Sequence, residues 1–378
     1  MTNNPVCAGR SSCPDVRTNS PRAWLLASRP KTLTGAIAPV LVGASFAIRH
    51  LMASGLSLNS QLSSLNSQPS TLNSQPSTLN SQLSTLNCLL ILCLLFAVFM
   101  QIDANLINDY FDFRKGTDRA DRLGPERACA QGWITPKAMR WGIAVMTILS
   151  CLVGLAILYM IPFSILHFSL LLAVGLLCVV FCFLYTTHLS YRGWGDLLVL
   201  IFFGLIPVLF TYYVMTIGLD LNSQLSTVNS QLSTLNFHLP LLLASLAMGL
   251  ATDNLLMVNN YRDRHQDLLS GKRTIIVRII EAQKRKLGDE QGQKEGEQIC
   301  LDIYLWLGIF AVLLALTALF FHPLSTIRYP LLLIYLILHF KTFQQLKTLD
   351  GRDLNRVLGQ TARNIFLFGL LLAISVFL

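Results

Sequence analysis

The chain has 378 residues, of which 53% are hydrophobic and only 13% carry a charge. Soluble domains contain roughly a quarter charged residues, so this composition excludes an ordinary water-soluble enzyme, a disordered chain and a coiled coil. The basic residues behind the net charge of +9 lie in short stretches between apolar runs. That pattern is typical of membrane topology signals and not of a nucleic-acid-binding surface. The sequence therefore predicts an all-α integral membrane protein.

Residues 1–22 form a polar N-terminal tail that lacks the apolar core of a signal peptide, and residues 23–378 are predicted to form a single transmembrane domain. A bilayer core of about 30 Å requires roughly 20 apolar residues per helix. The segments that meet this requirement predict a bundle of about nine spanning helices, at 33–52, 88–108, 141–161, 164–185, 197–218, 239–258, 301–321, 328–345 and 360–378.

The basic residues predict the orientation of these spans. No Lys or Arg lies between Arg49 and Arg114, or between Arg192 and Arg262. Lys and Arg are enriched in cytoplasmic loops. We therefore expect the N-terminus inside and the C-terminus outside, in the inner membrane of a bacterium.

Two predicted outer loops, 57–87 and 222–236, repeat Ser, Leu, Asn and Gln at heptad spacing. Leucine at every seventh position is compatible with a coiled-coil stalk. Against a stalk stand Pro69, Pro76, the many Ser and Asn residues and the missing charges. Such polar tracts bury too little surface to offset the entropy of ordering. We interpret both as mostly disordered insertions, with a role in adhesion or assembly as the alternative.

A first polar block follows the second predicted span. Asn105, Asp109 and Asp112 are spaced i, i+4 and i+7, which places them on one helical face if the helix continues that far. Carboxylates one turn apart repel each other unless a cation lies between them, and a set of Asp and Asn oxygens suits a hard ion such as Mg²⁺. The same block contains Asn108 and the basic residues Lys115, Arg119 and Arg122.

A second polar block follows the sixth predicted span, on the same side of the membrane. Asp263 and Asp267 are again spaced i, i+4, and Asn260 precedes them. Lys272 and Arg278 follow and can donate to phosphate oxygens. We expect the two carboxylate clusters to face each other across a cavity and to share Mg²⁺ with a diphosphate. The alternative is that these acids form solvated ion pairs with neighbouring arginines.

Three further polar residues lie inside predicted spans or at their edges, namely Asp103, Asp253 and Asn254. Such residues are costly in a bilayer and commonly mark a site or a pathway. The alternative is that they reach toward the interface.

The two blocks resemble the aspartate-rich motifs of the UbiA-type intramembrane prenyltransferases. The resemblance rests on SRPKTL at Ser28–Leu33, on Asn105–Arg127 with its string GTDRADRLGPER, and on Asn259–Arg278. It is closest to the members that act on 1,4-dihydroxy-2-naphthoate. The resemblance implies a helical bundle around a central cavity, with Mg²⁺ and the donor diphosphate held on the cytoplasmic face. It implies these metal ligands: Asn105, Asp109, Asp112, Asp263 and Asp267.

Many members space the first motif NxxxDxxxD, whereas here the second carboxylate is Asp112 and is followed by Phe113. Either Asp112 or Asp118 completes the motif. The resemblance implies polyprenyl diphosphate and 1,4-dihydroxy-2-naphthoate as substrates, with Arg29 and Lys31 near the naphthoate carboxylate. The resemblance further implies that the basic residues of the two blocks bind the diphosphate oxygens, namely Lys115, Arg119, Arg122, Lys272 and Arg278. Candidate wall residues for an allylic cation are Tyr110, Phe111, Tyr185, Tyr191 and Trp194.

Two alternatives to this reaction stay open at the level of the sequence. The first is a related prenyltransferase that acts on 4-hydroxybenzoate or on a haem or chlorophyll precursor. The second is a carboxylate-coupled transporter, although transporters place their polar groups near the midplane of the membrane. We expect neither a nucleic acid nor an obligate protein partner.

Overall fold

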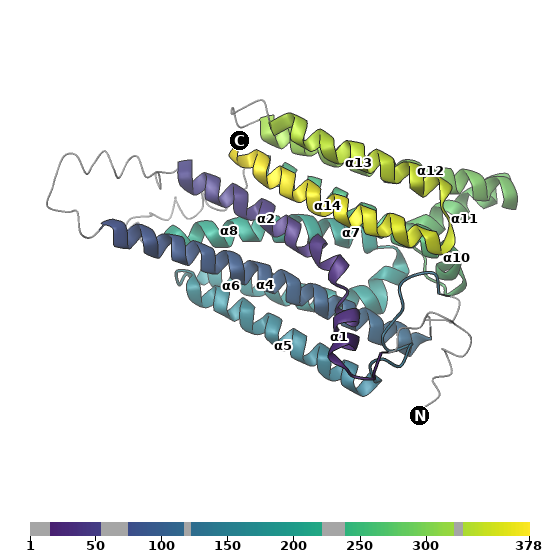
Figure 1. Ribbon diagram of the computed structural model, residues 1–378, viewed down its shortest axis with the longest axis horizontal. Helices are drawn as coiled ribbons and strands as arrows, with labels where there is room; N and C mark the ends of the chain where they lie inside the picture. Colours follow the sequence, from purple (N-terminus) through teal and green to yellow (C-terminus); the bar gives the residue numbers. More distant parts are fainter. Residues whose placement is uncertain (1–15, 54–74, 117–121, 221–238, 321–327) are drawn as a thin grey trace.

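The computed structural model describes residues 16–53, 75–116, 122–220, 239–320 and 328–378. Within these ranges the chain is helical and contains no strand, so the prediction of an all-α protein is confirmed. The long helices run side by side in one bundle (Figure 1). The elements are α1 (Pro21–Ser28), α2 (Pro30–Ala53), α4 (Gln75–Lys115), α5 (Pro136–Met160), α6 (Ile165–Leu184), η2 (Tyr185–Leu189), η3 (Ser190–Arg192), α7 (Gly195–Leu200), η4 (Ile201–Leu205), α8 (Ile206–Asp220), α10 (Leu239–Leu269), α11 (Ile275–Leu287), α12 (Asp289–Phe320), α13 (Arg328–Thr348), η5 (Gly351–Asp353) and α14 (Leu354–Phe377).

Eight helical segments of the described chain are long and apolar enough to cross a membrane. They match the predicted spans with the exception of 328–345, which lies within α13. This helix packs beside α12 and α14, but Lys341, Gln344 and Gln345 lower the hydropathy of its C-terminal half. A multi-pass helical membrane protein follows from these segments. The ninth span and the orientation stay predictions.

The structure corrects part of the interpretation of the tract 57–87. Helix α4 begins at Gln75 and continues through the polar repeat into the apolar span, so Gln75–Asn87 is helical. Pro76 lies in the first turn, where a missing N–H breaks no hydrogen bond of the helix. Adding residues to an existing helix is far easier than nucleating one, and Leu86 packs against the core. Residues 57–74 and 222–236 lie outside the described residues.

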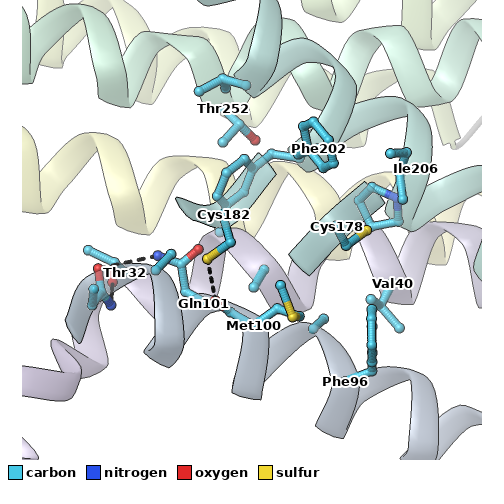
Figure 2. A pocket seen from close by; sticks show the side chains of 18 of the residues that line it. Thr32, Val40, Phe96, Met100, Gln101, Cys178, Cys182, Phe202, Ile206 and Thr252 are labelled. Atoms are coloured by element: carbon cyan, nitrogen blue, oxygen red, sulfur yellow. Dashed lines mark hydrogen bonds between the residues drawn. The ribbon is translucent and has the colours of Figure 1, made fainter. Parts of the chain in front are cut away.

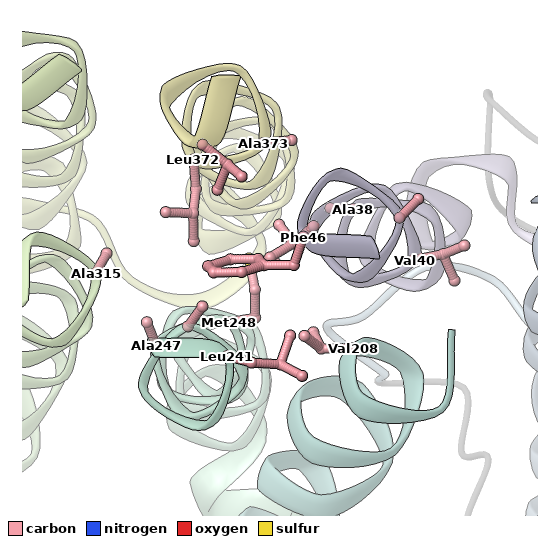
Figure 3. Packing of buried hydrophobic residues seen from close by; sticks show 14 of the residues in the cluster. Ala38, Val40, Phe46, Val208, Leu241, Ala247, Met248, Ala315, Leu372 and Ala373 are labelled. Carbon is pink, nitrogen blue, oxygen red and sulfur yellow. The ribbon is translucent and has the colours of Figure 1, made fainter. Parts of the chain in front are cut away.

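The bundle core lies between α2, α8, α10 and α14. In Figure 3, the ring of Phe46 on α2 lies between Leu372 of α14 and Met248 of α10. Gly43 lets α2 approach α8, since a Cβ there would collide with the carbonyl oxygen of Val208. Close contact through small residues is how helices associate when lipid is the solvent.

Replacing Gly43 by alanine is expected to destabilise the protein by about 1–3 kcal/mol, because a backbone oxygen cannot move aside as a side chain can. Gly35 is the matched control on the same helix, since a Cβ there meets no atom within 4 Å. Gly35→Ala should leave stability unchanged or slightly raised. Thermal unfolding of the detergent-purified protein measures both. Equal melting temperatures for the two variants would contradict this account of the contact between α2 and α8.

Helices α4 and α10 both finish at the end of the bundle where α1 lies (Figure 1). There the chain turns from α1 into α2 at Arg29, a non-glycine residue with a left-handed backbone (φ 51°). Two threonines cap the helices that leave this end. Thr135 accepts a hydrogen bond at the start of α5, and Thr274 does so at the start of α11. The two polar blocks are thereby brought to one end of the molecule.

Candidate active site

A cavity of about 700 Å³ lies inside the bundle, between α2, α4, α5, α6, the α7–α8 segment, α10 and α14. Most of its wall is apolar. Figure 2 shows Thr32 and Gln101 on one side of the cavity, with Val40, Phe96 and Ile206 on the other. Its polar end is lined by Arg29, Lys31, Thr32, Gln101, Asn105, Asn108, Asn259 and Asn355.

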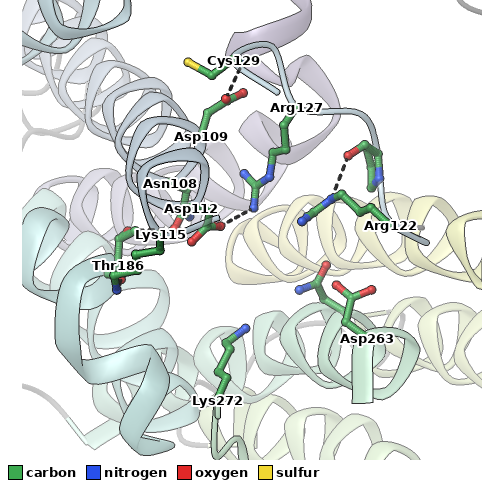
Figure 4. Close-up of polar contacts among 12 residues, drawn as sticks. Asn108, Asp109, Asp112, Lys115, Arg122, Arg127, Cys129, Thr186, Asp263 and Lys272 are labelled. Carbon is green, nitrogen blue, oxygen red and sulfur yellow. Dashed lines mark hydrogen bonds and ion pairs between the residues drawn. The ribbon is translucent and has the colours of Figure 1, made fainter. Parts of the chain in front are cut away.

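Asp109 does not face this cavity. Its two carboxylate oxygens accept hydrogen bonds from the backbone N–H groups of Ala128 (2.8 Å) and Cys129 (3.0 Å). The residue is 1% exposed, and Figure 4 shows it turned toward Cys129 and away from Asp263. The structure therefore directs the Asp109 side chain away from the face that Asp112 presents, and its hydrogen bonds anchor the returning loop to α4. A metal-ligand role for Asp109 stays a prediction.

Asp112, one turn further along α4, does face the second block. It accepts a hydrogen bond from the guanidinium of Arg127 at 2.8 Å, and 19% of its side chain is exposed. Asn108 lies one turn before it on the same side of the helix, lines the cavity and accepts a hydrogen bond from Thr186 Oγ1 at 2.8 Å. Asn108 and Asp112 therefore lie one turn apart on the side of α4 that is turned toward the second block.

Asn105 lines the cavity but is already engaged. Its amide nitrogen donates to the carbonyl oxygen of Ser28 (2.9 Å) and to Thr32 Oγ1 (3.0 Å). Its amide oxygen accepts from Gln101 at 3.5 Å. These contacts join α4 to the turn between α1 and α2, which indicates that Asn105 shapes the polar end of the cavity.

The second block is ordered by a buried arginine. Arg262, which is 1% exposed, donates from Nε and from a terminal nitrogen to the two oxygens of Asp263, both at 2.7 Å. It also donates to the side-chain oxygens of Asn259 and Asn355, each at 2.8 Å. Asn355 in turn donates to the carbonyl oxygen of Leu123 in the loop of the first block. This network fixes the orientation of Asp263 and links the two blocks.

Asp267 has few partners by comparison. Lys272 Nζ lies 3.4 Å from its Oδ1, and its buried Oδ2 accepts no hydrogen bond from the described part of the chain. Asn260, two turns earlier on α10, is buried and lines a small polar pocket together with Lys272.

The two acidic blocks share their cations. Lys272 and Arg122 act electrostatically on Asp112 and also on Asp267. In Figure 4, Asp112 of α4 and Asp263 of α10 lie on opposite sides of the region that holds Arg122 and Lys272. Carboxylates of both blocks thus lie around the same basic side chains, with Asp112 as the member from the first block, but the lining of the large cavity contains no carboxylate. That the two clusters share Mg²⁺ across a cavity stays a prediction. The ion pairs of the alternative are present, although they are mostly buried and not solvated.

Arg264 belongs to the scaffold of this site. It donates to Glu297 at 2.9 Å and to Asp350 at 3.3 Å, and lies over the ring of Tyr261. Partial burial would raise the pKa of Asp350, but the N–H of Gly351 and the charge of Arg264 outweigh it and hold that pKa below its usual value. These contacts join α10, α12 and the turn before α14.

The other predicted basic residues lie around the same end of the molecule. Arg29 also acts electrostatically on Asp112. Lys115 is exposed, and its Nζ donates to the carbonyl oxygens of Thr186 and Thr187 and lies above the ring of Tyr191. Lys31 is exposed and lines the cavity. Arg122 donates to the carbonyl oxygen of Pro125. Arg278 is exposed and donates to the carbonyl oxygen of Arg192. Asp118 and Arg119 lie outside the described residues.

Asp103, Asp253 and Asn254 are all buried within the protein. Thr147 donates to Asp103 at 2.6 Å, between α4 and α5. The alternative that these residues reach toward the interface is therefore wrong.

Magnesium was predicted for this site, and the residues present fit it. Among the described residues there is no group of three or more His, Cys, Asp or Glu that could hold a metal ion. Mg²⁺ does not require one, because it commonly uses one or two carboxylates and fills its other positions with water and substrate phosphate. The buried Oδ2 of Asp267 and the partly exposed carboxylate of Asp112 suit such a site.

The aromatic walls of the cavity differ from those expected. Tyr185 lines the cavity as predicted. Tyr110 and Phe111 pack near a separate cluster around Met139, and Trp194 is 52% exposed. The cavity instead receives phenylalanines from four helical segments, which the sequence analysis did not single out because each lies in an ordinary apolar run: Phe96, Phe181, Phe202, Phe203 and Phe210.

Comparison with known proteins places this architecture in a family. The profile of the UbiA prenyltransferase family matches residues 78–374. The 1,4-dihydroxy-2-naphthoate octaprenyltransferase of Escherichia coli is 30% identical over 268 residues, which cover 70% of this chain and 71% of that protein. The Haemophilus influenzae protein of the same name is 32% identical over 193 residues, which cover 50% of this chain and 57% of that protein. A solved UbiA homolog from Archaeoglobus fulgidus bound to DMAPP and Mg²⁺ is 14% identical and covers 93% of this chain and 98% of its own, with a TM-score of 0.48.

The chain belongs to the UbiA prenyltransferase family. The resemblance inferred from the sequence is thus confirmed. Membership of a prenyltransferase family argues against the alternative of a transporter.

Proposed function

We propose that this protein is a Mg²⁺-dependent polyprenyltransferase that joins polyprenyl diphosphate to 1,4-dihydroxy-2-naphthoate. The bond between the first prenyl carbon and the diphosphate breaks, that carbon bonds to the ring carbon bearing the carboxyl group, and CO₂ leaves. The product is demethylmenaquinol, which oxidises to demethylmenaquinone in menaquinone biosynthesis. The relatives named for this acceptor support the proposal. The structural observation behind it is an apolar cavity whose polar end meets two carboxylate blocks with shared cations.

The donor diphosphate would lie between the two blocks. Arg122 and Lys272 act electrostatically on carboxylates of both blocks and would donate to diphosphate oxygens. Asp112, Asp263 and Asp267 would hold the metal there, with Asn108 beside them. When bound, Mg²⁺ would neutralise charge on the diphosphate and so make it a better leaving group.

The prenyl end of the donor would enter the apolar part of the cavity. Loss of diphosphate leaves an allylic cation, which water would capture unless it is excluded. Phe181 and Phe202 lie with ring centroids 5.3 Å apart on the cavity wall, and Tyr185 lies toward the acidic end. Aromatic faces stabilise a nearby cation and keep the chamber dry.

The acceptor would bind at the polar end, where Arg29 and Lys31 can meet its carboxylate. The positive-inside pattern favours a cytoplasmic position for this end, in a bacterial inner membrane. The second candidate acceptor, 4-hydroxybenzoate, also carries a carboxylate, so the choice between them is a matter for the assay.

Removing divalent metal should reduce prenyl transfer to background, and adding Mg²⁺ should restore it. We would incubate the purified protein with labelled polyprenyl diphosphate and 1,4-dihydroxy-2-naphthoate, with EDTA and then with excess Mg²⁺. Parallel reactions contain 4-hydroxybenzoate as the acceptor. Prenylated naphthoate as the main product supports the proposal. Product with the other acceptor alone, or equal turnover in EDTA, would refute it.

A further inference from the structure

Three side chains from three helices line the apolar end of the cavity, opposite the acidic blocks. They are Leu158 of α5, Leu171 of α6 and Phe210 of α8. On their other side they pack against a buried cluster made of Ile161, Tyr213 and Ile217. This part of the cavity wall is therefore backed by a second layer of packed side chains.

One buried hydrogen bond braces this end. His167 Nδ1 and the hydroxyl of Tyr213 lie 2.6 Å apart, and the two residues are 4% and 1% exposed. The ring of Tyr213 also packs edge-on against Phe210, with centroids 6.2 Å apart. A hydrogen bond in dry surroundings is costly to break, because each partner would be left unsatisfied. The hydrogen bond therefore ties α6 to α8, and the ring of Tyr213 supports Phe210 on the side that faces the buried cluster.

The distance between the apolar end and the acidic blocks can be followed along α6. Leu171 lies at the apolar end, and Tyr185 lies near the charges of Asp112 and Asp267. At a rise of 1.5 Å per residue, about 21 Å of helix separates Leu171 from Tyr185. A donor held by its diphosphate would extend its tail along this stretch, toward Phe210.

We propose that Leu158, Leu171 and Phe210 form a stop that sets how many isoprene units of the donor lie inside the protein. This inference rests on the proposed prenyl transfer. Each unit inside the cavity buries apolar surface against the protein and contributes to binding. A unit beyond the stop cannot do so. Phe210 is thereby a specificity-determining residue, and the pair of His167 and Tyr213 positions it.

Gly175 offers an independent way to move the end of the cavity. It lies one turn after Leu171 on α6, lines the cavity, and a Cβ there would meet no atom within 4 Å. A leucine at this position would project into the space and shorten the usable length. Leu176, its neighbour, is 56% exposed and does not line the cavity.

The test measures kcat/KM with all-trans prenyl diphosphates of increasing length and one fixed acceptor. In the wild type, kcat/KM should rise with each added unit and then level off or fall at one length. Phe210→Ala should move this turning point to a donor about one unit longer, and Gly175→Leu should move it to a shorter one. Tyr213→Phe, which keeps the ring but removes the hydrogen bond, should move it as Phe210→Ala does, by less. The control Leu176→Ala should leave it in place.

A turning point that stays at one length in both Phe210→Ala and Gly175→Leu would overturn the stop. A wild-type profile without a turning point would do the same. In either case prenylated naphthoate would still form, so the proposed function would stand. Absence of product with every donor would instead remove the proposed function, and the stop with it. Should Phe210→Ala not fold, Gly175→Leu decides alone, because its site is open.

Discussion

Exchanging Asp267 for asparagine is expected to lower prenyl transfer at least about a hundredfold while leaving the fold intact. The side chain is buried, yet its Oδ2 has no hydrogen-bond partner in the described chain and its Oδ1 meets only the partly exposed Lys272. Asparagine has nearly the same shape but no charge with which to bind a divalent cation. The measurements are kcat with saturating Mg²⁺ and the thermal unfolding temperature of the purified protein.

Asp112→Asn should show a similar loss of activity, because Asp112 is the carboxylate of the first block that faces the shared cations. Asp302→Asn is the matched control, since Asp302 is exposed on α12 and accepts a hydrogen bond from Gln298. Asp263→Asn is a poorer test, because it leaves the buried charge of Arg262 without its partner and costs stability as well. Near-normal turnover of both Asp267→Asn and Asp112→Asn would exclude the metal role.

Asp109→Ala should behave in the opposite way and act mainly on stability. Its two oxygens accept the buried N–H groups of Ala128 and Cys129. Each N–H left unsatisfied costs about 1–3 kcal/mol, so we expect a loss of roughly 2–6 kcal/mol. Asp109→Asn keeps one acceptor oxygen and should lose about half as much. Thermal unfolding in detergent measures both variants.

The dependence of activity on Mg²⁺ separates this account from a ligand role for Asp109. If Asp109 only anchors the loop, the surviving folded fraction of Asp109→Asn should require the same Mg²⁺ concentration as the wild type. An unchanged melting temperature combined with a strongly raised Mg²⁺ requirement would instead restore Asp109 as a metal ligand.

The sequence predicts the fold well because the membrane imposes a simple rule. Apolar runs of sufficient length must be helical in lipid, and eight of the predicted spans coincide with helices that meet that description. The start of α4 was harder to predict. Ser, Thr and Asn, which make up much of this segment, are weak helix formers, and attachment to a strong apolar helix allows Gln75–Asn87 to continue it.

The acidic blocks were predictable in kind but not in detail. Helical spacing places Asn105, Asp109 and Asp112 on one face, but it does not tell which part of that face a loop will cover. The loop returns so that Ala128 and Cys129 donate to Asp109, a contact between residues about twenty positions apart. Only the folded chain shows that Asp112, and not Asp109, faces the basic residues near the second block.

Residues that act through three-dimensional placement left no local signal. Phe202 and Phe210 read as ordinary members of an apolar run, and nothing in the sequence distinguishes them from lipid-facing neighbours. Arg262 likewise reads as one basic residue among several. Its complete burial follows from three acceptors that come from α10 itself and from the start of α14.

Under the role that we propose for Asp263, the buried guanidinium of Arg262 has a consequence for the speed of each catalytic cycle. Because the guanidinium donates to both oxygens of Asp263, the orientation of this carboxylate is fixed before a substrate arrives. Dipoles and charges that are set in advance need no rearrangement as charge develops. The entropic cost of arranging the group is met once, during folding, and is not repeated at every turnover.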